Sequence, residues 1–327
     1  MIRNLLTLFY TLLVGAVWAQ SPRTAVVEHF TNTRCSICAA NNPAFYQTLS
    51  NYPQVLHIAF HPSAPYVNCL FSQQNKTEND DRTNFYNAYG STPKVAVQGK
   101  LLPASNPIIT ATTLDTVVNQ TSPIEISAVE EFVAADSIRV TIVVRTTGSI
   151  GAQNVLLFAG VTEDPVFYNA PNGETVHHDV FRKALTAVTG DVFAPATAGD
   201  SVMFEFGYQV KPSWIISQLR TLVFVQLSDT KEILNAAASV RLSSPLGGKE
   251  AVVERRNVYP NPASTSLFVR CAENETQAVQ IINVLGEVVW SGMPQTETIV
   301  IDIKELINGV YFLRTGERVT RFIKASR

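Results

Sequence analysis

Two cysteines separated by two residues, Cys35 and Cys38, form the part of this sequence best suited to chemistry. They follow an apolar run at residues 25–30 and precede a helix-compatible stretch at residues 39–49. A C-x-x-C pair in this setting indicates a redox centre, in which thiols and a disulfide interconvert. If a helix begins at Cys35, its unpaired N–H groups favour the thiolate of that residue. Spacing alone leaves a structural disulfide, half of a zinc site and chance as alternatives.

Charged and titratable residues next to the pair extend the candidate site. Arg34 places a positive charge beside Cys35. Glu28 and His29, on the preceding predicted strand, are alternative proton acceptors. Alternatively, neither serves the cysteines: neighbouring strand residues point to opposite faces, so one of the two would be buried and hydrogen-bonded and the other would face solvent. The residues alone do not decide which of them serves the cysteines.

Two prolines support a redox role for the pair. Thr92-Pro93 immediately precedes a predicted strand at residues 94–97, where a cis bond would leave the backbone before it free to pair with an extended substrate. Pro43 lies five residues past Cys38, inside the predicted helix. Together with the C-x-x-C pair, these features resemble the thioredoxin fold over roughly residues 24–99.

The thioredoxin resemblance implies roles for individual residues. Cys35 attacks a substrate disulfide and Cys38 resolves the mixed disulfide. Pro93, with Thr92 before it, shapes the groove that binds the substrate peptide. His29 falls where thioredoxins keep a buried acid. The chain departs from the family pattern in the residue before the first cysteine and in the two residues between the cysteines.

Composition and charge limit the partners and the number of domains. The chain has 327 residues, enough for two or three domains with cores of their own. Its formal net charge is -2 with both signs interspersed, so neither nucleic acid nor an anionic membrane is indicated as a partner. We expect no cofactor and no metal. There is no second C-x-x-C pair, His57 and His61 flank a strand end, and His177 and His178 lie in a polar turn.

The first residues predict export. Arg3, an apolar run at residues 5–17 and the small residue Ala19 form a secretory signal peptide, residues 1–19, which is cleaved after Ala19. The apolar run is too short for a membrane-spanning helix, and no later run is long enough, so we expect no transmembrane helix after cleavage. The mature chain then reaches an oxidising compartment, where disulfides persist.

The middle of the chain predicts a second, all-β domain at residues 120–242. Strand-like runs recur at residues 124–129, 137–144, 155–161, 201–206 and 222–227. Polar and apolar residues alternate in the second of these runs, as in a strand with one buried face. A sandwich of two antiparallel sheets would bury such faces. The fold class is therefore multidomain, with a thioredoxin-like α/β domain at residues 20–110 followed by the sandwich.

The run from Glu28 to Cys38, followed by this long β region, resembles the outer-membrane-protein-28-related family of Gram-negative surface proteins. That family also pairs a thioredoxin-like module with a β-rich half. The resemblance covers about residues 24–242. It implies a secreted or surface location more directly than it implies any substrate.

A linker at residues 243–256 precedes a small Ig-like β-sandwich at residues 257–327. Tyr-Pro-Asn-Pro at residues 259–262 makes the start of this domain rigid, and Gly286 and Gly309 mark turns between short strands. The order of these elements at the C-terminus resembles the type A sorting domain of the type IX secretion system. The resemblance implies recognition by the translocon and the sorting peptidase of that system. It also implies passage through the periplasm and a secreted or surface-attached product on a Gram-negative bacterium.

Two functions remain open at this point. One is a thiol-disulfide oxidoreductase that acts on protein thiols and disulfides through Cys35 and Cys38. The other is a non-enzymatic surface binding or adhesion protein in which the pair forms a structural disulfide. Cys69 is either a third redox cysteine or a buried free thiol, and Cys271 is expected to be a lone thiol. The sequence decides neither the substrate nor the direction of electron flow.

Overall fold

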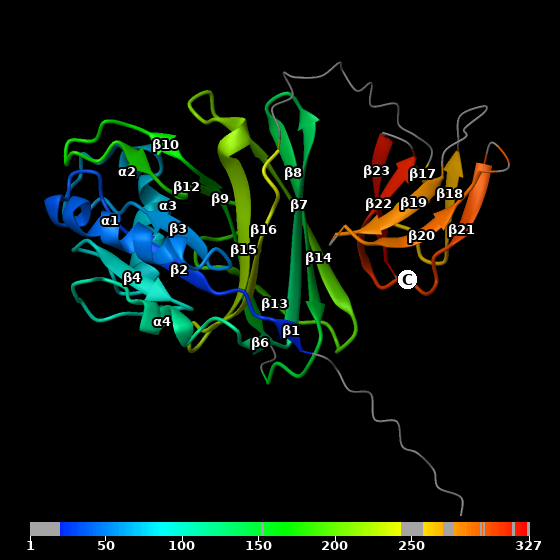
Figure 1. Ribbon diagram of the computed structural model, residues 1–327, viewed down its shortest axis with the longest axis horizontal. Helices are drawn as coiled ribbons and strands as arrows, with labels where there is room; N and C mark the ends of the chain where they lie inside the picture. The colour runs from blue at the N-terminus through cyan, green and yellow to red at the C-terminus, as the bar shows by residue number, and fades with distance from the viewer. Residues whose placement is uncertain are drawn as a thin grey trace, which may run out of the picture.

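Three parts of the chain follow one another across Figure 1: an α/β part in blue and cyan, a β-rich part in green and yellow, and a C-terminal domain in orange and red. The computed structural model describes residues 20–151, 154–242, 258–270, 278–284, 286–294, 296, 298–315 and 318–325. The predicted signal peptide, the predicted linker and Cys271 lie outside the described residues. We call residues 20–242, which hold the first two parts, the main body.

The α/β part is built on one edge of a large sheet. β2 (Val26–Phe30) and β3 (Leu56–Phe60) are parallel neighbours joined through helix α1 (Ser36–Ser50), and β4 (Lys94–Val97) is antiparallel to β2. The other elements here are α2 (Leu70–Gln74), α3 (Lys76–Phe85), β5 (Lys100–Leu101) and α4 (Ala111–Asp115). A parallel pair needs a crossover, which places the start of α1 at the carboxyl end of β2. The C-x-x-C pair lies at this helix start.

The same sheet continues into the β-rich part. Its strand order is β16-β15-β9-β12-β3-β2-β4-β5, with β13 (Asp191–Phe193) paired to β9. The added strands are β9 (Val155–Glu163), β12 (Val180–Ala184), β15 (Leu219–Leu227) and β16 (Ile233–Ala238). The two parts join where β12 runs parallel to β3, with Val180 opposite Ala59. The predicted boundary at residues 110–120 thus separates segments that share one sheet, and the domain boundaries stay a prediction.

A second sheet covers one face of β9 and β15. It consists of β7 (Ile124–Ala134), β8 (Ser137–Thr146) and β14 (Ser201–Gln209), all antiparallel. Its buried residues, such as Ile138 and Val140, pack against Leu157 and Val223. A two-layer β-sandwich therefore forms, as the alternating pattern predicts, but one of its layers is part of the sheet that carries the C-x-x-C pair.

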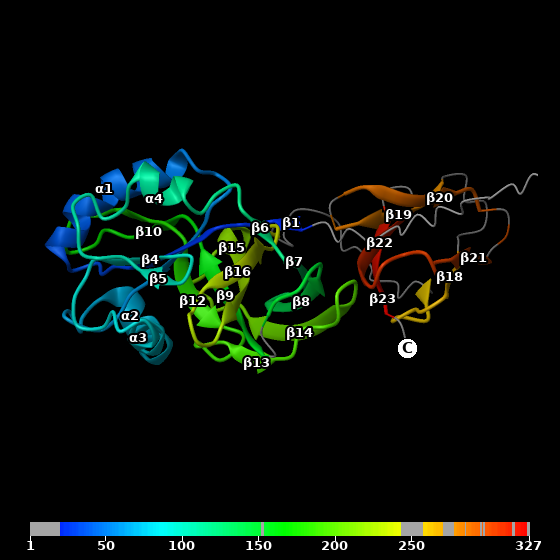
Figure 2. The same cartoon turned by 90° about the horizontal axis from the view of Figure 1, so that it is seen from below.

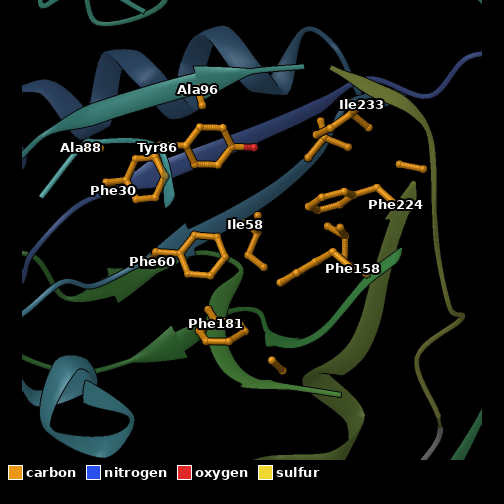
Figure 3. Close-up of a cluster of buried hydrophobic side chains, with 14 residues drawn as sticks. Phe30, Ile58, Phe60, Tyr86, Ala88, Ala96, Phe158, Phe181, Phe224 and Ile233 are labelled. Atoms are coloured by element: carbon orange, nitrogen blue, oxygen red, sulfur yellow. The ribbon is translucent and has the colours of Figure 1, made fainter. Parts of the chain in front are cut away.

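The opposite face of β9 and β15 packs into the α/β part. Phe158 and Phe224 stack with ring centroids 4.7 Å apart and share a core with Phe30 and Phe60 of the first strands (Figure 3). Every residue of β9 is buried, which explains its nearly unbroken apolar sequence. A strand that is covered on both faces cannot belong to an isolated two-sheet sandwich with a solvent-exposed back.

A small hairpin extends from the β-rich part back to the α/β part. Its strands are β10 (Val166–Phe167) and β11 (Val176–His177), and we call residues 166–177 the β10–β11 hairpin. The backbone N–H of Asn172 in this hairpin donates to the carbonyl oxygen of Thr33, at 3.2 Å. The hairpin therefore lies against the loop that leads into α1, and both Figure 1 and Figure 2 show β10 near that helix. A shorter antiparallel pair joins β1 (Ser21–Pro22) to β6 (Thr121–Ser122).

The C-terminal domain has a core of its own between two antiparallel sheets. The three-stranded sheet is β17 (Val258–Tyr259), β18 (Ser266–Arg270) and β21 (Thr298–Asp302). The four-stranded sheet is β20 (Val288–Gly292), β19 (Val279–Asn283), β22 (Gly309–Thr315) and β23 (Arg318–Lys324). Leu267, Ile281 and Phe322 are fully buried between them. Among the described residues of the whole chain, no helix is long and apolar enough to span a membrane.

Candidate functional site

The loop before α1 presents Cys35 as the helix cap. Cys35 has an extended backbone, with φ -85° and ψ 110°, and its Sγ accepts the backbone N–H of Cys38 at 3.0 Å. The turn before it is fixed by Asn32, whose Oδ1 accepts the N–H of Arg34 at 2.9 Å and whose carbonyl accepts the N–H of Cys35 at 3.1 Å. A sulfur at this position receives a free N–H of the first helical turn. The predicted helix start at Cys35 is therefore present.

Both cysteines are free and buried, and their surroundings separate their acidities. A hydrogen bond from the Cys38 thiol, assisted by Thr92 and by backbone N–H groups, lowers the pKa of Cys35 to about 6 against the opposing effect of burial. Burial, together with the hydrogen bond to Cys35, raises the pKa of Cys38 far above its ordinary value. Cys35 is thus the thiolate at neutral pH, and Cys38 is the thiol that donates to it.

Thr92 and Pro93 lie where the sequence predicts them. The Thr92–Pro93 peptide bond is cis, and the carbonyl oxygen of Thr92 lies 3.5 Å from Sγ of Cys35. Pro93 immediately precedes β4, which is hydrogen-bonded to β2. The tertiary structure therefore brings Cys35, Cys38, Thr92 and Pro93 to one place, although Pro93 is far from the cysteines in sequence.

The Arg34 side chain is held by a backbone carbonyl. Its Nε donates to the carbonyl oxygen of Asn68 at 2.6 Å. Next to Asn68, the buried Cys69 accepts the hydroxyl of Thr33 at 3.2 Å and is a free cysteine. Arg34 therefore ties the loop before α2 to the C-x-x-C loop, and hydrogen bonds are the main cause of the lowered pKa of Cys35.

Glu28 is fully buried on the face of β2 that points away from α1. Its carboxylate accepts Nε of Arg82 at 2.7 Å and the hydroxyl of Tyr86 at 2.5 Å. The Arg82 guanidinium lies 4.8 Å from the ring centroid of Phe158 and 5.3 Å from that of Phe224. Glu28 therefore neutralises a cation in the core between the two halves of the main body, and it is not free to serve the cysteines.

His29 is also fully buried, so the alternative in which one of the two residues faces solvent is wrong. The central strand β2 is covered on both faces, which leaves no solvent side. The His29 ring packs 4.3 Å from the Phe45 ring of α1, and neither ring nitrogen has a hydrogen-bond partner among the described residues. Burial holds the pKa of His29 well below its usual range. Of the two predicted acceptors, only the neutral His29 lies beneath α1.

Three of the other four histidines are each held by a different partner. His57 Nδ1 lies 3.1 Å from Asp179, His178 Nδ1 lies 2.8 Å from Asp164, and His177 Nε2 lies 3.1 Å from the carbonyl oxygen of Tyr168. Across the described residues, no group of three or more histidine, cysteine or acidic side chains is placed to hold a metal ion.

Two residues of the β10–β11 hairpin belong to the site and have no signal in the sequence. Nδ2 of Asn172 donates to the carbonyl oxygen of Cys35 at 3.2 Å and to the Glu174 carboxylate at 2.6 Å. The other oxygen of Glu174 accepts Nδ2 of Asn42, in α1, at 2.7 Å. In the sequence, Asn172 and Glu174 flank a glycine in what reads as an ordinary polar turn. No local pattern places that turn beside a motif more than a hundred residues earlier.

A groove of about 430 Å³ separates the hairpin from α1. Its walls include Asn42, Pro43 and Tyr46 on the helix and Asn172, Glu174 and His178 on the other side. Glu174 is half-buried, so its carboxylate meets solvent at the groove while it holds the helix.

One comparison with known proteins matches the C-terminal domain, and another matches most of the chain. Residues 257–325 match the family model described as a secretion system C-terminal sorting domain. The C-terminal domain is a secretion system sorting domain. The sorting domain directs the chain to secretion and to the cell surface, and its partner is the type IX secretion machinery. The predicted sorting domain, secretion to the cell surface and the secretion machinery as partner are confirmed, whereas recognition by the sorting peptidase stays a prediction.

The whole fold is shared with a solved structure. HBP35 of Porphyromonas gingivalis is 18% identical, with a TM-score of 0.59 over 94% of this chain and 99% of that chain. A domain of the outer membrane lipoprotein Omp28 from the same organism is 17% identical over 37% of this chain and 89% of that one, with a TM-score of 0.28. No curated protein matches the sequence. Of the predicted combination, the sorting domain is shown by the family match, and the likeness to HBP35 shows a shared fold.

Proposed function

We propose that this chain is a cell-surface thiol-disulfide oxidoreductase with a thioredoxin-like α/β part. The observation that carries the proposal is the setting of Cys35. Its sulfur accepts an N–H at the start of α1 and lies 3.5 Å from the carbonyl oxygen of Thr92. The parallel β2–α1–β3 unit, with antiparallel β4 next to β2, supports the thioredoxin-like assignment.

The reaction needs only the two cysteines and a substrate disulfide. The Cys35 thiolate attacks one substrate sulfur, the substrate S–S bond breaks, and the leaving thiolate takes up a proton. Cys38 then loses its proton and attacks Sγ of Cys35, which forms the Cys35–Cys38 disulfide and releases the second substrate thiolate. Two electrons pass from the cysteine pair to the substrate. The reverse sequence oxidises a substrate dithiol.

Pro93 and His29 have separate roles in this proposal. Pro93 and the Thr92 carbonyl form the wall against which an extended substrate peptide lies. His29 is neutral beneath α1, because burial lowers its pKa, and the same burial makes it a weak proton acceptor for the cysteines. Glu28 is excluded from this role by its bonds to Arg82 and Tyr86.

The test is catalysis by the full secreted chain beside Cys35→Ala and Cys38→Ala. Insulin reduction in the presence of dithiothreitol, and refolding of scrambled ribonuclease, should proceed with the unmodified chain. Both should fall to background with Cys35→Ala, because no thiolate is left to attack. Cys38→Ala should accumulate mixed disulfides, which mass spectrometry detects. Equal and negligible rates for all three chains would refute the oxidoreductase proposal.

The burial of Cys35 favours a second candidate. The residue is 1% exposed, which would suit a structural disulfide in a surface binding or adhesion protein. Under this alternative, native protein purified without reductant would hold the Cys35–Cys38 disulfide, and a large excess of glutathione would not reduce it. Rapid reduction would reject it.

For the sorting domain, we propose that the type IX translocon recognises residues 257–327 and that the sorting peptidase removes them. The intact mass of the surface-exposed protein tests this directly. A product that lacks the signal peptide and the sorting domain is expected, and a product that keeps the sorting domain would contradict cleavage.

A further inference from the structure

The outer face of the second sheet, which points away from β9 and β15, is buried along its central strand. Residues of β8 alternate between the two faces of this sheet, and Ile142 and Val144 pack in the core of the sandwich. Thr141 and Val143 therefore point outward, yet they are only 1% and 6% exposed. A sheet with one solvated face would leave such residues open to water. Another part of the chain must cover them.

The sorting domain supplies this cover. Arg321, on β23, donates from Nη1 to the hydroxyl of Thr141, and its Nη2 lies 3.1 Å from Oε1 of Glu131, on β7. Only 11% of the Arg321 side chain is exposed. On β14, Oγ of Ser201 donates to the carbonyl oxygen of Asn308 in the sorting domain, at 3.4 Å. Figure 1 and Figure 2 both show the sorting domain beside the second sheet.

The contact between the two surfaces is loosely packed. Two cavities, of about 240 and 420 Å³, lie between the second sheet and the sorting domain. Both are lined by Val143 on one side and by Asn308 and Gly309 on the other. The cores of stable protein interfaces are packed as densely as protein interiors, without voids of this size. The intrinsic affinity of these surfaces for each other is therefore low.

Covalent attachment compensates for a low affinity. The predicted linker at residues 243–256 joins the sorting domain to the main body. A short linker gives two attached parts an effective concentration on the order of 1 mM, so a dissociation constant of about 0.1 mM would keep the sorting domain docked about nine-tenths of the time. With the same constant, separated parts at micromolar concentration would be almost entirely dissociated.

We propose that the outer face of the second sheet is a docking surface for the sorting domain, held by Arg321, and that the docking lasts only while the linker is intact. Cutting the linker releases the sorting domain and uncovers Thr141 and Val143. The docking is independent of the proposed function. The release rests on it for its biological meaning, since the sorting peptidase is proposed to remove this domain.

The test measures how accessible the covered face is in the full chain. Val143→Cys is combined with a site for a sequence-specific protease in the linker. Its alkylation by N-ethylmaleimide is followed by peptide mass spectrometry, which separates position 143 from the native cysteines. Val133→Cys, at a position of β7 that is 51% exposed, is the matched control. Size-exclusion chromatography at micromolar concentration shows whether the two parts separate after the cut.

Alkylation at position 143 should become about tenfold faster after the cut, because the docked fraction falls from about nine-tenths to nearly zero, and the two parts should elute separately. Before the cut, Arg321→Ala should accelerate alkylation about three- to tenfold, because it removes an ion pair and a hydrogen bond from the docked state. Arg314→Ala, which removes a side chain bonded to Gln280 within the sorting domain, should leave the rate unchanged. Val133→Cys should react at the same rate in every chain.

Three results would overturn the proposal. Equal rates at position 143 before and after the cut would mean that the sorting domain does not cover this face. Co-elution with continued protection after the cut would mean that docking does not need the linker. Full protection in the uncut Arg321→Ala chain would mean that this arginine does not hold the docked state.

A second reporter keeps the test usable if Val143→Cys does not fold. Ser127→Cys, on β7, is nearly isosteric and lies in the wall of the smaller cavity, so it reports on the same face. An added protease makes the cut, so the result does not depend on the sorting peptidase. A secreted product that keeps its sorting domain would therefore contradict the proposed cleavage and leave the docking measurement valid.

Discussion

The sorting domain and the main body differ in the distance over which their decisive residues are gathered. The sorting domain closes its core within residues 258–325. The candidate site in the main body draws Cys35 and Cys38 from one end, Thr92 from another loop, and Asn172 and Glu174 from a hairpin in the β-rich part. The sorting function is thus carried by one contiguous segment of the chain. The candidate site, in contrast, depends on contacts between residues that are far apart in the sequence.

The large sheet of the main body explains why the candidate site is assembled from distant segments. β12 pairs with β3, and β9 with β15 buries one face against the α/β part and the other against the second sheet. The hairpin that holds Glu174 leads into β12, so its position is set by the pairing of that strand. The β-rich part therefore contributes residues to the surroundings of the C-x-x-C pair.

Deleting residues 257–327 should have the largest effect on the function of the sorting domain and almost none on the candidate site in the main body. Surface display should be lost, because the sorting domain carries the address, while the alkylation rate of Cys35 in the purified main body should not change. Protease accessibility on intact cells measures the first, and iodoacetamide kinetics the second. Continued display, or an altered Cys35, would mean that the two regions are not independent.

Breaking the buried ion pair tests whether the main body is one folding unit. Glu28→Ala leaves the charge of Arg82 buried without its partner and should lower the free energy of unfolding by about 3–5 kcal/mol. Urea denaturation measures this, and both the α/β and the β-rich signals should shift together. Lys76→Ala, which removes an exposed partner of Asp80, is the control and should leave the midpoint nearly unchanged. Two separate transitions in the parent chain would argue for independent domains.

Gly99, which lies between the α/β part and the β-rich part, offers a smaller perturbation of the stability of the main body. Gly99 has φ +83°, and a Cβ there would lie 1.6 Å from the carbonyl oxygen of Lys231, in the turn between β15 and β16. Gly99→Ala should cost about 1–3 kcal/mol, because the backbone of the two halves must separate. Gly173→Ala, whose Cβ would meet no atom within 4 Å, also has positive φ and isolates the conformational part. Equal losses for both would show that the close approach is unimportant.

The acidity of Cys35 gives the smallest expected effect. Its thiolate forms above a pKa of about 6, so the alkylation rate should rise through pH 6 and level off near neutrality. Between pH 6 and the ordinary thiol value of 9.0, the unfolded chain binds more protons, so stability should increase with pH. Cys38→Ala removes the main hydrogen bond and should slow Cys35 alkylation at pH 7 roughly three- to tenfold. A profile unchanged by Cys38→Ala would point to another cause.

Features governed by neighbouring residues were the predictable part of the site. The helix start at Cys35, Pro43 inside α1, and the cis bond before Pro93 all depend on short stretches of chain, and each is present. The sequence identified Glu28 and His29 as candidates but did not predict their roles. Alternation along a strand assigns residues to two faces of the sheet, but it does not show which elements cover each face. Asn42 offered a weak signal, as a polar residue within a helix, and Glu174 offered none.

The sequence by itself determined the C-x-x-C pair and its helix cap, the strands of the β-rich part, and the sorting domain, because capping, alternation and motif order are properties of nearby residues. Only the tertiary structure decided that the predicted sandwich shares a sheet with the α/β part, that Glu28 serves Arg82, and that Glu174 reaches Asn42. Strand partners and loop contacts are selected by how the whole chain buries its apolar faces, and that choice has no local sequence code.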